Sequence, residues 1–157
     1  MKPLLFAAAA LFVCAMPAAS QTMSYGLNIN VETAKKLAAP AIAEARKNNW
    51  NMAVAIVDTA GDLVYFERMD DTQAGSVQVA QSKARSAARF KRPTKAFQDA
   101  LAAGGEGLRI LALDGAIPVE GGVPLVAGGK IVGAIGASGG TSQQDGVVAQ
   151  AGAAALK

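Results

Sequence analysis

Residues 52–68 read MAVAIVDTAGDLVYFER and carry the clearest structural signal in the chain. An unbroken apolar run, Met52–Val57, is followed by the polar segment DTAGD and then by a second apolar segment, Leu63–Arg68. Two short segments of this kind around a glycine-containing turn are typical of an antiparallel β-hairpin. We therefore expect two neighbouring antiparallel strands in this stretch.

A second hairpin is predicted further along the chain. Val123–Ala127 and Ile131–Ala137 are apolar, and Gly128-Gly129 between them suits a tight turn. The stretch Ile110–Leu113 is ambiguous between helix and strand. No internal repeat and no long linker divides the chain, so one domain is expected.

Helices are predicted around the two hairpins. Apolar spacing indicates a helix from Val31 to about Asn48, which Pro40 is expected to kink or break locally on its solvent side. Further helices are expected at 76–92, at 94–103 with Thr94 as N-cap, and from Ser142 or Asp145 to the C-terminus. Alternating helices and hairpins favour an α+β fold with an antiparallel sheet.

The first twenty residues resemble a secretory signal peptide. Lys2 precedes the apolar run Leu4–Val13, and the small residues Ala18 and Ser20 suit cleavage after Ser20. The apolar run is shorter than the roughly 20 residues of a membrane-spanning helix. We therefore expect an exported, periplasmic or secreted protein whose single domain covers residues 21–157, with no membrane span in the mature chain.

The near absence of histidine and cysteine excludes several kinds of catalytic and metal-binding site. The chain has no histidine and one cysteine, Cys14, which lies in the predicted signal peptide. The mature chain therefore has no disulfide, thiol nucleophile, Ser-His-Asp triad or Cys/His zinc site, and we predict no metal-ion site. The net charge of +3 does not by itself predict nucleic-acid binding, because such binding needs clustered basic residues.

Lys83 stands apart from its basic neighbours. On a helical wheel Arg85, Arg89 and Arg92 form a polar stripe, which is typical of a solvated helix face. Lys83 falls on the opposite, apolar face. Two interpretations stay open for it: a side chain that reaches water past small alanines, or an amine that contacts an anionic ligand or takes part in catalysis.

Acidic residues and glycines supply the other candidates. Asp58, Asp70 and Glu120 could act as general bases, although Asp58 lies beside a turn, where acids usually bind the turn itself. The glycine-rich run 133–140 precedes a helix, and its amides could hold an anion. The run lacks a nucleotide-binding fingerprint, so this signal is weak.

Several motifs together resemble the HbpS/GlcG family of haem-binding, sometimes haem-degrading, domains, which is related to the C-terminal domain of PduO-type corrinoid proteins. The motifs are AIVDTAGDL at 55–63, RMD at 68–70, AQSKA at 80–84, GGVP at 121–124 and VGAIGASGG at 132–140. They occur in the family's order, and the resemblance covers nearly all of residues 27–157.

This resemblance implies a profilin-like α/β/α arrangement, in which a five-stranded antiparallel sheet lies between helices. It also implies oligomers and a small-ligand pocket beside the sheet, with haem as the best-known ligand. The motifs mark these candidate cofactor-binding residues: Arg68, Met69, Lys83, Gly121, Gly122, Pro124 and Ser138.

The chain departs from the family in one respect, because related domains can use a histidine to bind the haem iron. The thioether of methionine and the phenolate of tyrosine can also bind haem iron. The possible ligands in this chain are therefore Met52, Met69, Tyr25 and Tyr65. We expect Met69, within the RMD motif at a strand end, to be slightly preferred.

Three classes of function remain open. The first is an exported domain that binds a small molecule, haem or another planar anion, with Lys83, Arg68 and the arginine stripe as carboxylate partners. The second is a metal-free enzyme on a small organic acid or aromatic, with Asp58, Asp70 or Glu120 as base and Lys83 as acid or anion stabiliser. The third is an oligomeric envelope protein that serves a partner or sensor.

Overall fold

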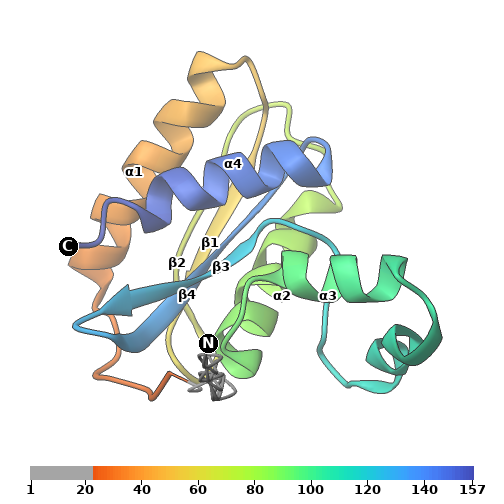
Figure 1. The fold of residues 1–157 in the computed structure, drawn as a ribbon. Helices are drawn as coiled ribbons and strands as arrows, with labels where there is room; N and C mark the ends of the chain where they lie inside the picture. Colours follow the sequence, from red (N-terminus) through yellow and green to blue (C-terminus); the bar gives the residue numbers. More distant parts are fainter. Residues whose placement is uncertain (1–22) are drawn as a thin grey trace, which may run out of the picture.

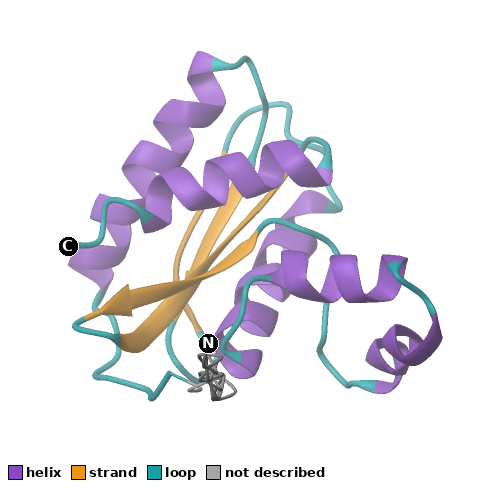
Figure 2. Ribbon diagram, viewed as in Figure 1, coloured by secondary structure: helices purple, strands orange, loops and turns teal. Residues whose placement is uncertain are grey.

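A computed structural model describes residues 23–157, so the predicted signal peptide and Cys14 lie outside the described residues. Four strands form one sheet in the order β2-β1-β4-β3: β1 (Ala53–Val57), β2 (Leu63–Arg68), β3 (Gly122–Ala127) and β4 (Lys130–Ser138). Every neighbouring pair is antiparallel, and helices cover both faces of the sheet (Figures 1 and 2). Both predicted hairpins and the α+β class are confirmed.

The sheet has four strands among the described residues, whereas the family resemblance implied five. In the place of a fifth strand, Tyr25 forms an isolated bridge with Ile131 at the start of β4. The Gly26 N–H donates to the Ile131 carbonyl at 2.7 Å. This pairing stays short because a helix, capped by Asn30, begins at Val31.

Helices α1 (Val31–Lys47) and α4 (Ser142–Ala153) lie side by side on one face of the sheet (Figure 1). Helix α1 runs through Pro40 without interruption, so the predicted local break is wrong. Pro40 removes one backbone hydrogen bond. Its neighbours on the inner side hold the helix against the core: Leu37, Ala38, Ala41 and Ile42 are all buried.

Helix α2 (Ser76–Phe90) covers the other face through small residues. Ala80, Ala84 and Ala87 are completely buried against the sheet. At Gly136 of β4 an added Cβ would lie 2.1 Å from the Ala80 carbonyl oxygen, so only glycine permits this close approach. The abundance of alanine in the sequence therefore reflects a helix that lies very close to its sheet.

Helix α2 ends two residues earlier than predicted, because Lys91 adopts a left-handed conformation with φ 55°. Helix α3 (Thr94–Ala102) and the 3-10 helix η1 (Gly105–Ala112), which resolves the ambiguous stretch, extend away from the sheet (Figure 1). None of the helices among residues 23–157 combines the length and apolar character needed to cross a bilayer.

Candidate ligand-binding site

A cavity of about 560 Å³ lies at the β3 edge of the sheet, between α4 and the start of α3. This volume is within the usual range of small-molecule sites. Its walls come from four parts of the chain: α1, the start of α3, the segment that enters β3, and α4. The lining residues are Glu44, Pro93, Lys95, Glu120, Gly121, Gly122, Val123, Gly146, Val147, Gln150, Ala151 and Ala154.

The walls of this cavity are mainly apolar, and three charged side chains also line it: Glu44, Lys95 and Glu120. Val123 of β3 and the α4 residues Val147 and Ala151 belong to its apolar wall. The ammonium of Lys95 is half-exposed and lies 2.7 Å from the Asp99 carboxylate. That hydrogen bond raises the pKa of Lys95, and the charges of Asp99 and Glu120 raise it further. Lys95 therefore stays a cation, but one that already has anionic neighbours.

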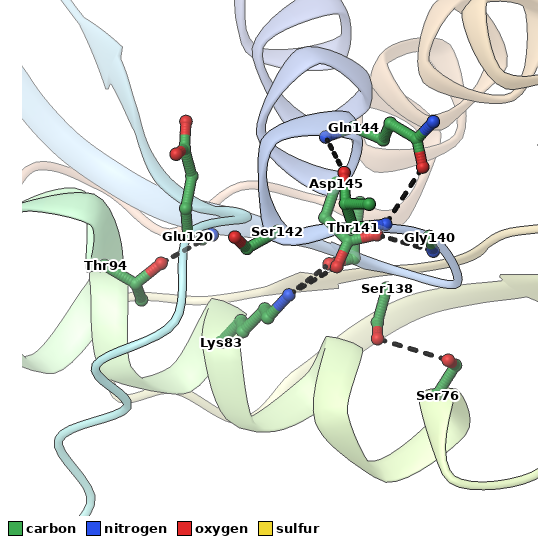
Figure 3. A network of polar contacts seen from close by, with 12 residues as sticks. Ser76, Lys83, Thr94, Glu120, Ser138, Gly140, Thr141, Ser142, Gln144 and Asp145 are labelled. Atoms are coloured by element: carbon green, nitrogen blue, oxygen red, sulfur yellow. Dashed lines mark hydrogen bonds and ion pairs between the residues drawn. The ribbon is translucent and has the colours of Figure 1, made fainter. Parts of the chain in front are cut away.

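Directly behind Gly121 lies a buried ion pair between two helices. Lys83 Nζ of α2 lies 2.6 Å from Asp145 Oδ2 of α4, and it also donates to the Ala137 carbonyl at 3.3 Å (Figure 3). The side chains of Lys83 and Asp145 are only 1% and 4% exposed. The predicted core-facing position of Lys83 is confirmed, and its anionic partner is supplied by the chain itself. Contact of Lys83 with a ligand stays a prediction.

Gly121 makes room for this pair. Its φ of 128° is a conformation that other residues rarely adopt. A Cβ at this position would lie 2.9 Å from Lys83 Nζ and 2.8 Å from the Asp145 Cβ. One residue without a side chain therefore separates the ion pair from the cavity.

Two hydrogen bonds hold the chain on either side of Gly121. The Gly122 N–H donates to Thr94 Oγ1 at 2.9 Å, and the Glu120 N–H donates to Gln98 Oε1 at 2.8 Å. Thr94 is the first residue of α3 and gives no side-chain cap to the helix, so the predicted N-cap role is wrong. Its hydroxyl is directed to β3 instead, and it thereby fixes the floor of the cavity.

The start of α4 is occupied by the chain's own side chains. Thr141 and Gln144 form a reciprocal capping box, and Asp145 Oδ1 accepts from the Gly140 N–H at 3.1 Å (Figure 3). Gly140 is the last residue of the glycine-rich run, and its amide is therefore bound by the chain's own carboxylate. The structure gives no support to an anion site at this amide.

A second, polar cavity of about 280 Å³ contains the RMD motif. Arg68, Met69 and Asp70 line it together with Arg46, Asn51, Glu67 and Asp71. Arg68 Nη2 donates to the Thr72 carbonyl at 2.9 Å. This cavity is at the same end of the sheet as the first one but beside β2, the opposite edge strand. Three strand spacings separate the two edges by roughly 14 Å.

The predicted site residues are therefore divided between several places. Glu120, Gly121 and Gly122 line the apolar cavity. Pro124 is buried in β3, where an edge strand tolerates proline. Ser138 is buried at the end of β4 and donates to Ser76 Oγ at 3.2 Å (Figure 3).

The four acid-base candidates are not brought together. Asp58 follows β1 at the other end of the sheet, and its Oδ1 accepts from the N–H groups of Ala60 and Asp62 at 2.9 Å each. Asp70 lines the polar cavity, Glu120 the apolar one, and Lys83 is buried in its ion pair. The arginine stripe also binds this turn, since Arg85 donates to Gly61 and Arg89 to Ala60.

The possible haem ligands lie away from the apolar cavity. Met52 is fully buried in the core, and Met69 lines the polar cavity. The Tyr25 hydroxyl donates to the Ala88 carbonyl at 2.9 Å. Burial raises the pKa of Tyr65, as do its hydrogen bond to Glu67 and the charge of that carboxylate. A raised pKa keeps the phenol protonated and disfavours phenolate ligation.

Several residues of this site were not predicted from the sequence. Asp145 was considered as a helix start and as part of a family motif, but not as the partner of Lys83, and Lys95 only as one of a run of basic residues. Among residues 23–157, Lys83 and Asp145 are the two charged residues that are buried, so Asp145 stands out in the structure. Among the same residues, no group of three or more His, Cys, Asp or Glu is placed to hold a metal ion.

Comparison with known proteins agrees with this fold and these motifs. A family described as haem degrading protein HbpS-like matches residues 29–154. Protein GlcG of Escherichia coli K12 is 38% identical over 110 residues, which cover 70% of this chain and 81% of that protein.

Solved structures are similar over most of their length. The crystal structure of an HbpS double mutant from Streptomyces reticuli is 29% identical with a TM-score of 0.77, covering 96% of this chain and 99% of that one. A structure titled PduOC:Heme Complex is 27% identical with a TM-score of 0.74, covering 83% of this chain and 96% of that one. The chain described here belongs to the HbpS-like family.

Proposed function

We propose that this protein binds haem, or another planar anionic molecule, in the apolar cavity between α3, β3 and α4. The observation that carries the proposal is the cavity itself: its walls are apolar, and it lies beside the sheet of an HbpS-like fold. A similar protein, PduOC, has been solved as a haem complex. A flat ring that enters between Val123 and Val147 would gain from the burial of apolar surface.

The charged side chains that line the cavity set the orientation of such a ligand. Glu44 and Glu120 line the same cavity as Lys95, and Asp99 is bound to Lys95. Carboxylates of the ligand would be repelled from the acidic side chains. The ligand therefore inserts its apolar edge and leaves its carboxylates in water, near the ammonium of Lys95.

A haem titration tests this proposal. We expect the Soret band to shift and saturate with the mature protein. Ala151→Trp, on the cavity wall, fills the site and abolishes saturable binding, whereas Ala39→Trp, at an exposed position of α1 on the far side of that helix from Glu44, leaves it intact. Equal binding by both tryptophan variants would show that haem, if bound, lies elsewhere. Binding by neither the parent nor the control would reject the proposed function.

Two further parts of the proposal concern the location of the protein and its oligomeric state. Export is supported by the charged and apolar start of the sequence and by the small residues Ala18 and Ser20.

Assembly into a homo-oligomer is supported by exposed apolar side chains on η1 and the loop after it: Leu108, Leu111 and Leu113 are 55%, 70% and 43% exposed. Analytical ultracentrifugation of the parent and of Leu108→Asp/Leu111→Asp tests the assembly, which the double substitution should weaken.

A further inference from the structure

We infer that the apolar cavity recognises the porphyrin ring and not its metal, so that metal-free protoporphyrin IX binds about as tightly as haem. This inference rests on the proposed function. It goes further, because it states which part of the ligand supplies the affinity.

The residues that line the cavity lack the side chains that usually bind haem iron. Haem iron in proteins is held by histidine, cysteine, methionine or tyrosine. The whole chain has no histidine, and none of the twelve described residues that line the cavity is a cysteine, methionine or tyrosine. This donor set does not fit iron ligation.

The methionines and tyrosines considered as iron ligands, Met52, Met69, Tyr25 and Tyr65, do not line the cavity. Met69 lies at the opposite edge of the sheet, roughly 14 Å away across three strand spacings. Met52 is completely buried beneath α1. Tyr65 donates to Glu67 at 3.0 Å. None of these side chains reaches a ring that lies against Val123 and Val147 without a rearrangement of the core or of the sheet edge.

The cavity walls provide apolar contacts for the ring of the ligand. Val123, Val147, Ala151 and Ala154 form apolar surface that a flat ring can contact. Apolar contact depends on the ring and is indifferent to the metal in its centre. The nearest buried cation, Lys83, is neutralised by Asp145 at 2.6 Å and adds no strong attraction for the ligand.

Parallel titrations of the mature protein test the inference. Metal-free protoporphyrin IX is followed by its own fluorescence, and haem by Soret absorbance and by quenching of Trp50. We expect the two dissociation constants to agree within about threefold, which is well below the tenfold change that 1.4 kcal/mol would produce. Ala151→Trp should abolish both, and the exposed Ala39→Trp should preserve both.

The same experiment separates two failures. If haem saturates at the cavity and protoporphyrin binds more than about tenfold more weakly, iron contributes to affinity and the inference is wrong while the proposed function stands. If neither ligand saturates, the proposed function itself fails. Met69→Leu and Tyr65→Phe provide an independent check: the Soret maximum of bound haem should be unchanged in both, and a shift in either would contradict the inference.

Discussion

Lys83 and Asp145 are 62 residues apart in the sequence, yet their charged atoms lie 2.6 Å apart in the interior. Lys83 belongs to α2 on one face of the sheet, and Asp145 belongs to the first turn of α4 on the other (Figures 1 and 3). The pair therefore joins both helical layers around the end of the sheet. Gly121, which lines the cavity, packs directly against it.

Loss of either partner of this pair should destabilise the fold strongly. Lys83→Met leaves the Asp145 carboxylate buried without its cation, and a broken buried pair costs about 3–5 kcal/mol. We expect urea denaturation to show a loss of that size. Lys83→Met/Asp145→Leu should recover a large part of it, because no charge then remains unpaired. A Lys83→Met variant as stable as the parent would show that the pair contributes little.

Gly121→Ala tests the contact between the pair and the cavity wall. The added methyl meets Lys83 Nζ, Asp145 Cβ and the Ala137 carbonyl, all within 2.9 Å. The positive φ alone costs about 1–3 kcal/mol for a residue other than glycine, so the midpoint of thermal unfolding should fall. Gly75→Ala is the matched control, since it has nothing within 4 Å and a φ of −62°. A similar midpoint for both variants would contradict the tight packing at Gly121.

Lys95→Met should change haem affinity only modestly. The ammonium is half-exposed and already bound to Asp99, and water screens the charge of such an exposed ion pair. We therefore expect haem to bind at most about fivefold more weakly. Isothermal titration of the parent and the variant measures this. A loss of about a hundredfold would make Lys95 the main anchor and would contradict the proposal that the apolar ring supplies the affinity.

Cleavage after Ser20 predicts a mature chain that begins at Gln21. The charged start, the short apolar run and the small residues Ala18 and Ser20 give the reason. The intact mass of protein recovered from the periplasm or the medium checks the position. Protein that keeps residues 1–20 after expression in its own host would disprove both the cleavage and the proposed export.

Much of the fold could be predicted from local sequence patterns. Apolar spacing placed Lys83 on the inner face of α2, and glycine turns between apolar runs located both hairpins. These features depend on residues within one helix or one hairpin. Pro40 does not break α1, because buried neighbours on the same helix outweigh one missing hydrogen bond.

The site was less predictable because its contacts join distant segments. Asp145 reaches Lys83 across 62 positions, and the Thr94 hydroxyl binds Gly122 across 28. Family motifs identified Arg68, Met69, Gly121 and Gly122 as candidates, but sequence order does not reveal that two of them lie at each edge of the sheet. Lys95 was overlooked because a lysine in a basic run usually only solvates a helix.

The most direct test of the proposed binding site is to locate the bound porphyrin ring. Metal-free protoporphyrin is diamagnetic, and its ring current displaces the NMR signals of methyl groups that lie against it. With methyl-labelled protein, we expect large shifts of the methyl signals of Val123, Val147 and Ala151 and no shift of the Met69 signal. Large shifts at Met69 with unchanged signals from Val147 would place the ligand at the other edge of the sheet and contradict the account.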